Sequence, residues 1–318
     1  MKQNVVITGV RGFVGRNLKE YLIDHSEFDL TGASRNKLAL TELQDELSNI
    51  CSYNEIYDGT YNFDAYVHLA GKVISTSKKG DDGDFFKINF EQTKNIFDRF
   101  VADKDSKKFI FISTIHVVAE NPQRVIDESF EPRPYTEYGK SKYLAEKYIE
   151  ENCPPDKKYY ILRPSMIHGP GNQGNLNLLY GLVSRGLPYP VGAVDNKRSF
   201  VSIENLCFII KKIIEKDIDS GLYNVSDDEP TSTHNLVHLI ANKTNRKAKL
   251  LHININYLRW LSKIGNVLPF PLNDYRLQKL TNDFIVSNEK IKNAIGEPLP
   301  VRSEDGLSIT IDSFLSDK

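Results

Sequence analysis

The chain alternates short β-rich runs with amphipathic segments, and this alternation limits its fold more than any other feature. Apolar runs recur through the first half of the chain, with the sequences NVVITG, FDLTGAS, AYVHLAG, KFIFIST and YYILRPS. Amphipathic stretches lie between them, at residues 15–25, 85–101 and 139–151. Strand, helix and strand at this spacing predict an α/β fold with a doubly wound parallel sheet.

The composition changes after about residue 169, where GPGNQGNLN and GLPYPVGAVDNKR are rich in Gly, Pro and Asn. A short strand-like run, LYNVS, and a helical tail follow. Loops of this kind usually hold ligands on a scaffold. We expect a Rossmann-type dinucleotide-binding domain and a smaller, discontinuous C-terminal substrate domain. The first comprises residues 1–168 plus 199–226, and the second comprises 169–198 plus 227–318.

Composition and charge exclude several classes of protein. The chain has 318 residues, 40% of them hydrophobic, which is enough for a sizeable core. A net charge of -1 gives no bulk electrostatic reason to bind nucleic acid. Cys51, Cys153 and Cys207 are widely separated, so they indicate neither a disulfide framework nor a metal cluster, and we expect a reducing, cytoplasmic setting.

The sequence also argues against membrane insertion. The N-terminus has no apolar region with a cleavage site, so we expect no signal peptide. The most lipid-like stretch, residues 255–272, is interrupted by Arg259, Lys263 and two prolines. We interpret it as a helix of the substrate domain rather than a membrane contact.

The first chemical signal is TGVRGFVG, residues 8–15, directly after the first expected strand. Its glycines allow a tight turn, a close approach of the backbone to a diphosphate, and close packing of the next helix. At the start of a strand-helix-strand pattern, this motif predicts a dinucleotide site. The candidate cofactor-binding residues of the loop are Gly9, Arg11, Gly12, Phe13, Val14 and Gly15.

The end of the second expected strand favours NADP over NAD. An NAD site usually has an acid there, about 20 residues beyond the glycines, to bind the ribose hydroxyls. Here Ser34 takes that position and Arg35 follows, while Asp29 lies too early in the strand to reach the ribose. A guanidinium binds phosphate well, so we prefer NADP, with NAD as the alternative. Otherwise Arg35 is a solvated arginine in a turn.

Two further strand ends carry candidate residues. In FDAYVHLAG, Leu69, Ala70 and Gly71 let a cofactor pass close to the strand end, and we interpret His68 as a structural core histidine. The run IFIST places Ser113 and Thr114 at the carboxyl end of its strand, where ligands of open α/β sheets bind.

About 25 residues after that strand, YTEYGKSK opens an amphipathic helix. Tyr138 and Lys142 are four residues apart, so they lie on one face of the helix. The sequence therefore combines a hydroxyl at a strand end with a Tyr/Lys pair on the next helix.

Taken in order, TGxxGFxG, HLAG, the helix with Asn89, the Ser-Thr strand end, YGKSK and LRPSMIHGPG resemble one family. It is the NAD-dependent epimerase/dehydratase group of the extended short-chain dehydrogenase/reductases. The resemblance implies that Tyr138 is the catalytic acid/base and Lys142 its activator and ribose holder. It also implies that Thr114 binds the reacting oxygen, and that Asn89 and Arg163 belong to the cofactor site.

Physical chemistry is compatible with these roles. Free tyrosine has a pKa near ~10, and an ammonium ~5 Å away at an effective dielectric of ~20 would lower it by about two units. We therefore expect Lys142 to lower the pKa of Tyr138 and to let it exchange a proton.

The resemblance also constrains the reaction. Dehydratases of the family carry an Asp-Glu pair directly after the Thr, whereas this chain has Ile115 and His116, so we reject dehydration. Reduction of a 4-keto sugar by NADPH and 4-epimerisation with tightly bound NAD remain. Val118 and His168 replace tyrosines that are usual in the family, which weakens the epimerase interpretation.

Asn175 and Arg198 match positions at which related enzymes hold the nucleotide diphosphate of a UDP-sugar. Alternatively, Asn175 is a loop amide and Arg198 is a surface arginine, neither of which binds a ligand. His116 is either a substrate contact or a structural histidine. The downstream runs LPYPVGAVDNKRS and YNVSDDEPTST resemble bacterial 4-keto-reductases that form UDP-N-acetylquinovosamine for surface polysaccharides.

The preferred hypothesis is therefore reduction of UDP-2-acetamido-2,6-dideoxy-4-hexulose. The alternatives are a UDP-glucose or UDP-N-acetylglucosamine 4-epimerase, and a non-catalytic dinucleotide-sensing protein. By analogy with the group we expect a homodimer. Phe86, Phe90, Phe97 and Phe100 form either its interface or a stripe facing the core.

Overall fold

A parallel β-sheet forms the centre of the computed structural model, which describes residues 2–25, 27–73, 84–119, 122, 124–172, 174–189, 191–192, 194–265 and 273–316. Within these residues the sheet has seven strands in the order β10-β6-β5-β4-β1-β2-β3. Every neighbouring pair is parallel. The strands are β1 (Gln3–Thr8), β2 (Phe28–Ser34), β3 (Asn49–Ser52), β4 (Ala65–His68), β5 (Lys108–Ile112), β6 (Lys158–Pro164) and β10 (Gly221–Val225).

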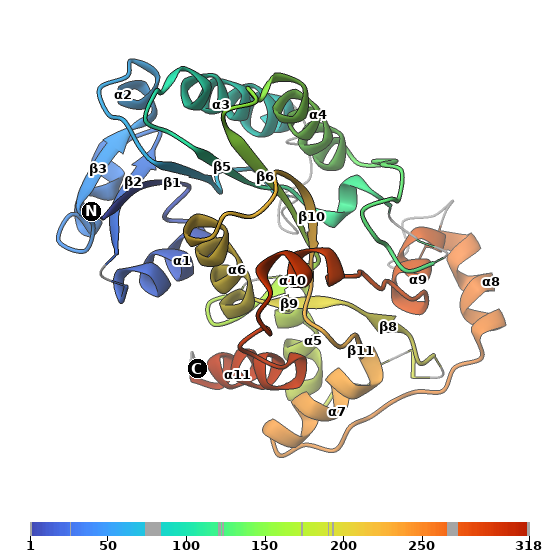
Figure 1. Cartoon of the computed structure of the whole chain (residues 1–318). Helices are drawn as coiled ribbons and strands as arrows, with labels where there is room; N and C mark the ends of the chain where they lie inside the picture. Colours follow the sequence, from blue (N-terminus) through green and yellow to red (C-terminus); the bar gives the residue numbers. More distant parts are fainter. Residues whose placement is uncertain are drawn as a thin grey trace.

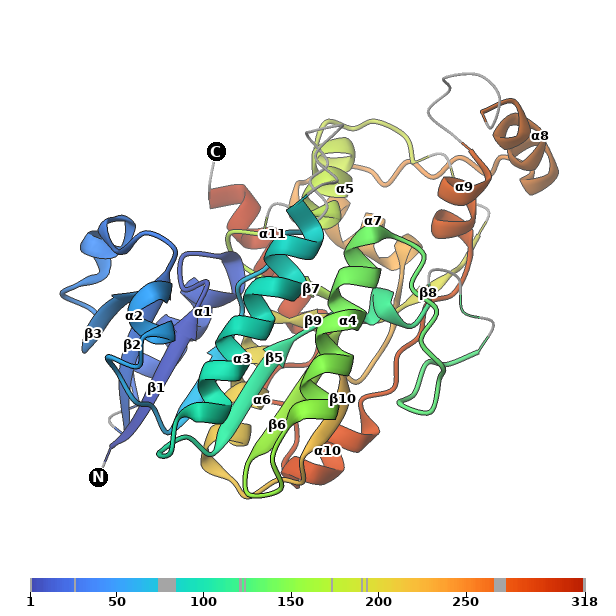
Figure 2. The ribbon, with the colours of Figure 1, turned by 90° about the horizontal axis from the view of Figure 1, so that it is seen from above.

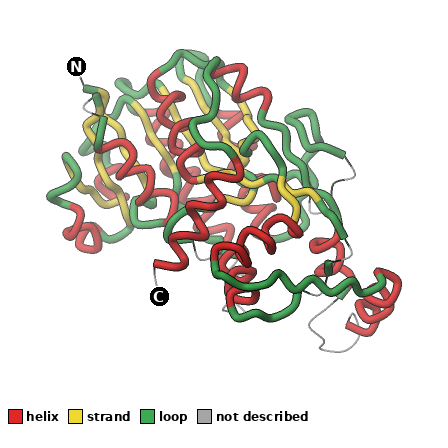
Figure 3. The backbone as a smooth tube through the Cα atoms, turned by 90° about the horizontal axis from the view of Figure 1, so that it is seen from below, coloured by secondary structure: helices red, strands yellow, loops and turns green. Residues whose placement is uncertain are grey.

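Helices cover both faces of this sheet (Figures 1 and 3). Val5, Ile7 and Ile110 pack with the apolar side chains of α1 (Phe13–Ile23) and α6 (Ile203–Glu215). The alternate residues of the same strands, including Val6 and Phe109, pack with α3 (Gln92–Ala102) and α4 (Glu137–Asn152), which lie side by side in Figure 2. Strand side chains alternate between faces, so two apolar faces require two helical layers. The predicted doubly wound fold is confirmed.

The expected strands and helices are all present, with ends that differ by a few residues. One strand, β3, was not predicted, because NICS is short and has polar residues at both ends. Two short helices, α2 (Tyr53–Tyr57) and the π-helical η3 (Phe86–Glu91), also belong to the sheet region.

The second half of the chain adds smaller elements around a separate apolar core, which includes Leu176, Tyr180, Val237 and Ile311. This core also includes Phe200, while Ile291 and Ile295 pack in the core of the sheet, so the domain boundaries expected from the sequence remain a proposal. The remaining elements are η1 (Lys37–Leu43), η4 (Ile115–Val117), β7 (Met166–His168), α5 (Asn175–Ser184), β8 (Lys197–Arg198), β9 (Phe200–Ser202), β11 (Thr231–Ser232), α7 (Thr233–Lys243), α8 (Ile255–Gly265), α9 (Asp274–Thr281), α10 (Glu289–Ile295) and α11 (Ser303–Ser316).

An extended segment, residues 283–288, connects the two halves of the molecule through backbone hydrogen bonds. The Phe284 amide donates to the Lys197 carbonyl at 2.8 Å, and the Phe284 carbonyl accepts from the Ser199 amide at 2.9 Å. Further along, the Ile126 amide donates to Ile285 and the Ser287 amide donates to Ile126, each at 2.8 Å. The segment thereby holds the loop after β5 against the β8–β9 region.

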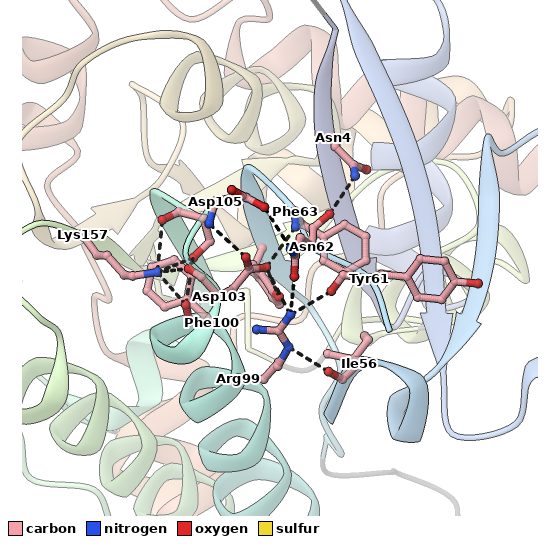
Figure 4. A network of polar contacts seen from close by, with 12 residues as sticks. Asn4, Ile56, Tyr61, Asn62, Phe63, Arg99, Phe100, Asp103, Asp105 and Lys157 are labelled. Carbon is pink, nitrogen blue, oxygen red and sulfur yellow. Dashed lines mark hydrogen bonds and ion pairs between the residues drawn. The ribbon is translucent and has the colours of Figure 1, made fainter. Parts of the chain in front are cut away.

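A polar network ties α3 to the amino ends of the strands, away from the carboxyl ends that carry the candidate site (Figure 4). The buried Asp103 carboxylate accepts hydrogen bonds from the Phe63 amide at 3.0 Å and the Tyr66 hydroxyl at 2.8 Å. The Lys157 ammonium donates to the carbonyls of Phe100 and Asp103. These contacts satisfy buried polar groups and stabilise the sheet.

Two predictions about apolar stretches are resolved in part. Phe97 and Phe100 are fully buried, so for these two residues the core interpretation is confirmed. The stretch 255–272 begins with the expected helix, α8, while residues 266–272 lie outside the described residues. Over the part of the chain that the structure describes, no helix has the length and apolar character needed to cross a bilayer.

Candidate active site

The glycine-rich loop joins β1 to α1 at the carboxyl edge of the sheet. Gly9 has a φ of 70°, and a Cβ there would lie 2.8 Å from the Ala70 nitrogen, so only glycine fits between the two strand ends. Gly12 is the N-cap of α1 and provides no side-chain cap, which leaves N–H groups of the first turn available. Phe13, Val14 and Gly15 form that turn. The loop therefore fits an anionic diphosphate.

The end of β2 has no acidic residue. The Ser34 hydroxyl donates to the Asn36 carbonyl at 2.6 Å and closes a tight turn. Arg35 is exposed and borders an open depression of about 310 Å³ that Tyr53 and Lys87 also line. Asp29 pairs with Lys2 at 3.5 Å near the start of β2, so the prediction that it lies too early is confirmed. Arg11 of the glycine-rich loop lies 3.5 Å from Glu42.

Beyond β4, residues 69–71 carry the chain over the buried residues of the site. A Cβ on Gly71 would lie 3.0 Å from the Lys142 Nζ and 3.1 Å from the Asn89 Oδ1. Asn89 is fully buried in η3, where its amide accepts from the Lys72 amide at 2.7 Å and donates to Ser141 at 3.1 Å. A π-helical turn at such a position is common at functional sites. Asn89 thus fixes the β4 end against α4.

His68 has the structural role that was predicted. Its ring nitrogens hydrogen-bond to the hydroxyls of Thr8 at 2.7 Å and Thr93 at 2.9 Å. Burial, together with the nearby Lys142 charge, lowers its pKa to about 3. His68 is therefore a neutral core residue that joins β1, β4 and α3.

Thr114 and Tyr138 meet at the carboxyl edge of the sheet. Thr114 follows β5 and caps η4, accepting a hydrogen bond from the His116 amide. Tyr138 lies in the first turn of α4, and the ring of Phe85 lies against it with centroids 6.2 Å apart. Burial raises the pKa of the Tyr138 phenol to about 12, and a hydrogen bond with the Thr114 hydroxyl opposes this rise.

Lys142 is one turn further along α4 and is only 4% exposed. Its ammonium donates to the Ile112 carbonyl at 2.8 Å and lies 4.5 Å from the Phe111 ring centroid. Burial lowers the pKa of Lys142 to about 7, and the Glu146 carboxylate opposes this. A desolvated ammonium of this kind is an ionisable group with a strongly shifted pKa, which is typical of functional sites.

The expected lowering of the Tyr138 pKa by Lys142 is wrong for the protein alone. The pKa of the phenol is instead raised, because burial disfavours the phenolate more than the hydrogen bond from Thr114 favours it. The Lys142 ammonium donates to the Ile112 carbonyl. At neutral pH the phenol therefore keeps its proton.

A buried ion pair lies next to these residues and was not predicted. Glu146, one turn beyond Lys142, accepts hydrogen bonds from the Arg163 Nε at 2.9 Å and from the Ser113 hydroxyl. Burial raises the pKa of Glu146, and Arg163 opposes this. The Arg163 guanidinium is thus bound to Glu146, and its assignment to the cofactor stays a prediction.

Two of the candidate substrate residues, His116 and Arg198, lie beside the same aromatic ring. The His116 ring and the Phe284 ring have centroids 6.1 Å apart, and the Arg198 guanidinium lies 5.5 Å from the same Phe284 ring. Arg198 also donates to the Lys279 carbonyl at 2.7 Å. Asn175 begins α5, but its side chain lies outside the described part of the structure. Phe284 therefore connects two predicted residues, and no local pattern in the sequence indicated this contact.

The two departures from the usual family pattern are both buried. Val118 packs with Ile126, Phe284 and Val286. His168 hydrogen-bonds to the Thr310 hydroxyl at 2.9 Å. Both positions therefore belong to the buried interior of the fold.

Comparison with known proteins decides the family. The profile of the NAD dependent epimerase/dehydratase family matches residues 5–226. The chain belongs to this family. The match includes the glycine-rich loop, the Thr114 strand end and the Tyr138 helix, as the resemblance of the motifs implied. The protein is therefore an NAD-dependent epimerase/dehydratase-type enzyme of the extended short-chain dehydrogenase/reductases.

Individual relatives of this family differ in their reactions. A UDP-glucose 4-epimerase of Vibrio cholerae is 29% identical over 99% of this chain and 96% of its own length. A GDP-6-deoxy-D-talose 4-dehydrogenase of Aggregatibacter actinomycetemcomitans is 25% identical over 74% of this chain and 78% of its own length. Among solved structures, a UDP-glucuronic acid 4-epimerase of Bacillus cereus in complex with NAD is 17% identical, with a TM-score of 0.76, and the match covers 98% of this chain and 99% of that one. The last match shows a shared fold.

Proposed function

We propose that this enzyme transfers hydride at C4 of a UDP-linked sugar. The observation that carries the proposal is the meeting of Thr114 and Tyr138 at the sheet edge, with the buried Lys142 one turn further along α4 beneath Gly71. A hydroxyl, a phenol and an ammonium at a dinucleotide-type loop suit the oxidation of an alcohol or the reduction of a ketone.

The residues present fit a nicotinamide dinucleotide. Gly9 packs against Ala70, and Gly71 packs against Lys142 and Asn89, so the backbone at the carboxyl edge of the sheet carries no side chains at these two positions. The first turn of α1 offers N–H groups to a diphosphate. The glycine-rich loop would hold the diphosphate, with Leu69, Ala70 and Gly71 beside it and Lys142 at the ribose. When bound, the nicotinamide supplies or accepts the hydride.

Tyr138 would donate the proton, and Thr114 would position the oxygen that receives it. The pKa of Tyr138 is about 12, so the phenol is protonated at neutral pH and is ready to donate to the oxygen of a 4-keto sugar. Thr114 would orient that oxygen by hydrogen bonding. Lys142, whose pKa is about 7, would gain its full charge as the phenolate forms beside it and would stabilise that anion.

We favour net reduction by NADPH. Arg35 is exposed at the β2 end where an NAD site would have an acid, and a guanidinium suits a 2'-phosphate. Ile115 and His116 follow Thr114, so the chain has no acid pair there for dehydration. We propose UDP-2-acetamido-2,6-dideoxy-4-hexulose as the substrate, in the synthesis of surface polysaccharide. His116, Asn175 and Arg198 would line its site, with Phe284 between His116 and Arg198.

A UDP-sugar 4-epimerase is the second candidate. The Vibrio cholerae relative carries that name over nearly its whole length, and the NAD-bound Bacillus cereus structure shares the fold. In this case hydride would leave C4 while Tyr138 takes the proton of the C4 hydroxyl, and hydride would return to the opposite face of the 4-keto sugar while Tyr138 gives the proton back to the C4 oxygen.

One assay distinguishes the reductase reaction from the epimerase reaction. A reductase should consume NADPH in a one-to-one ratio with the 4-keto sugar, whereas an epimerase should convert UDP-glucose or UDP-N-acetylglucosamine without added cofactor. Tyr138→Phe should lower either turnover about 10²- to 10⁴-fold, and Tyr143→Phe on the same helix should not. Dinucleotide binding without either turnover would support the non-catalytic alternative, and full activity of Tyr138→Phe would remove the proposed role of the phenol.

We retain three further proposals. The enzyme would form a homodimer through α3 and α4, with Phe90 and the exposed Leu144 nearer the interface than the buried Phe97. It would act in the cytoplasm, where its free Cys51, Cys153 and Cys207 stay reduced. The domain division at residues 168/169, 198/199 and 226/227 would separate the cofactor site from the sugar site.

A further inference from the structure

Helix α8 has an apolar surface that the rest of the described chain does not cover. The helix stands at the edge of the molecule and packs mainly on α9 (Figures 1 and 2). Leu258 and Ser262 face inward and are buried. On the other side, Tyr257 is 54% exposed and Trp260 is 57% exposed. Their rings stack with centroids 5.9 Å apart, so the two aromatics form one exposed patch.

Basic side chains flank this patch. Arg259 and Lys263 are exposed and four positions apart, so they lie together on one face of the helix, and Lys263 is three positions beyond Trp260. Among the described residues neither forms an ion pair. The segment from Lys243 to Lys263 contains six basic residues and no Asp or Glu, whereas the whole chain has a net charge of -1. The positive charge is therefore local to this region.

Exposed aromatics beside basic residues on one side of a short helix suit the boundary between a lipid bilayer and water. Trp and Tyr rings lie at the level of the headgroups, where an apolar body and a polar tip are both satisfied. Arg and Lys bind lipid phosphates and keep their stems along the apolar surface. The eleven residues of α8 are too few to span a bilayer, so the helix would lie flat on it.

We propose that α8 is a docking site for the surface of an anionic phospholipid bilayer, with Tyr257 and Trp260 entering the headgroup layer beside Arg259 and Lys263. This proposal replaces the expectation that residues 255–272 make no membrane contact. The occupant is anionic lipid because basic residues lie beside the exposed aromatics and α8 stands at the edge of the fold. This inference is independent of the sugar chemistry proposed above. Each basic residue near an anionic surface strengthens binding roughly fivefold, so docking would be reversible and sensitive to salt.

The protein carries its own reporter, because Trp260 is its single tryptophan. The full-length chain is titrated with vesicles of equimolar phosphatidylcholine and phosphatidylglycerol while tryptophan emission is recorded. The emission should shift to shorter wavelength, and lipids brominated near the headgroup should quench it. Vesicles of phosphatidylcholine alone should have little effect, and about 1 M salt should reverse the shift.

A pair of matched variants tests the location of the site. Arg259→Glu with Lys263→Glu should weaken flotation with the anionic vesicles at least about 30-fold. Lys104→Glu with Lys107→Glu, exposed in the loop between α3 and β5, changes the net charge equally and should leave flotation nearly unchanged. Circular dichroism checks that both variants fold. Equal flotation of the two variants, or no spectral shift with anionic vesicles, would overturn the proposal. A blue shift that depends on protein concentration without vesicles would also overturn it, because a second copy would then cover α8.

Discussion

The Arg163 guanidinium holds the Glu146 carboxylate through two hydrogen bonds, from Nε to Oε1 at 2.9 Å and from Nη2 to Oε2 at 2.5 Å. The pair links the end of β6 to the middle of α4, and Ser113 adds the end of β5 through its own hydrogen bond to Glu146. Since Ser113 precedes Thr114 and Glu146 follows Lys142 by one turn, the pair sets the position of α4 relative to Thr114.

Replacing Glu146 with Gln should therefore destabilise the protein. The change leaves the buried Arg163 charge without its partner, which costs about 3 kcal/mol of unfolding free energy. Urea unfolding at pH 7 measures this loss. Glu150→Gln on the same helix removes only a surface pair with Lys147 and should cost less than about 0.5 kcal/mol. Equal losses of unfolding free energy in the two variants would show that the buried pair stabilises the protein no more than a surface ion pair does.

The lowered pKa of Lys142 should make stability depend on pH. The folded-state value is about 7 and the unfolded value 10.5, so between these limits the unfolded chain binds more protons. The unfolding free energy contributed by Lys142 therefore rises with pH above 7, at up to about 1.4 kcal/mol per pH unit.

Lys142→Met isolates this contribution. Its unfolding free energy is compared with that of the natural protein between pH 7 and 9, below the range in which the buried tyrosines titrate. The variant should be the more stable at pH 7, and its advantage should shrink toward pH 9. A constant difference in unfolding free energy between pH 7 and 9 would contradict a lowered pKa of Lys142.

Gly71→Ala should impair cofactor binding without unfolding the protein. A Cβ there lies 3.0 Å from the Lys142 Nζ, so the ammonium must move away from its place beneath the β4 end. We expect turnover to fall at least about 10-fold and the cofactor to bind more weakly, as measured by steady-state kinetics and fluorescence titration.

Gly181→Ala in α5 is the matched control for that substitution. A Cβ on Gly181 meets nothing within 4 Å, so the change should preserve turnover and slightly favour the helix. If both alanines reduced activity alike, the loss would not come from the contact with Lys142.

Asp103→Ala should lower stability but preserve the chemistry. The change leaves the Tyr66 hydroxyl and the Phe63 amide buried without an acceptor, at a cost of about 2 to 4 kcal/mol. Because the network lies at the amino ends of the strands, the KM of the folded variant should be unchanged. Asp105→Ala, at an exposed position, should cost less than about 0.5 kcal/mol in the same thermal and urea experiments.

The sequence predicted those parts of the fold and site that depend on local patterns. Short β-rich runs located β1, β2, β4, β5 and β6, and spacing along a helix placed Tyr138 and Lys142 on one face. In the structure Gly71 lies against Lys142 and Asn89, and the expectation that the small residues after β4 let a cofactor pass stays a prediction.

The remaining features depend on contacts between distant segments. No pattern near Phe284 indicates that it reaches His116 and Arg198, and no pattern pairs Glu146 with Arg163. The sign of the Tyr138 pKa shift was missed for a related reason. A pairwise charge estimate omits desolvation, which depends on how completely the fold surrounds the phenol.

The extended segment 283–288 has a practical consequence for engineering. Because it is hydrogen-bonded to Lys197 and Ser199 on one side and Ile126 on the other, the two halves do not separate as independent lobes without breaking these bonds. Sugar discrimination would then reside in a preformed wall rather than in a closing movement. Grafting residues 169–198 from another enzyme would transfer only part of that wall, so a chimaera that changes substrate must also carry Phe284 and its flanking residues.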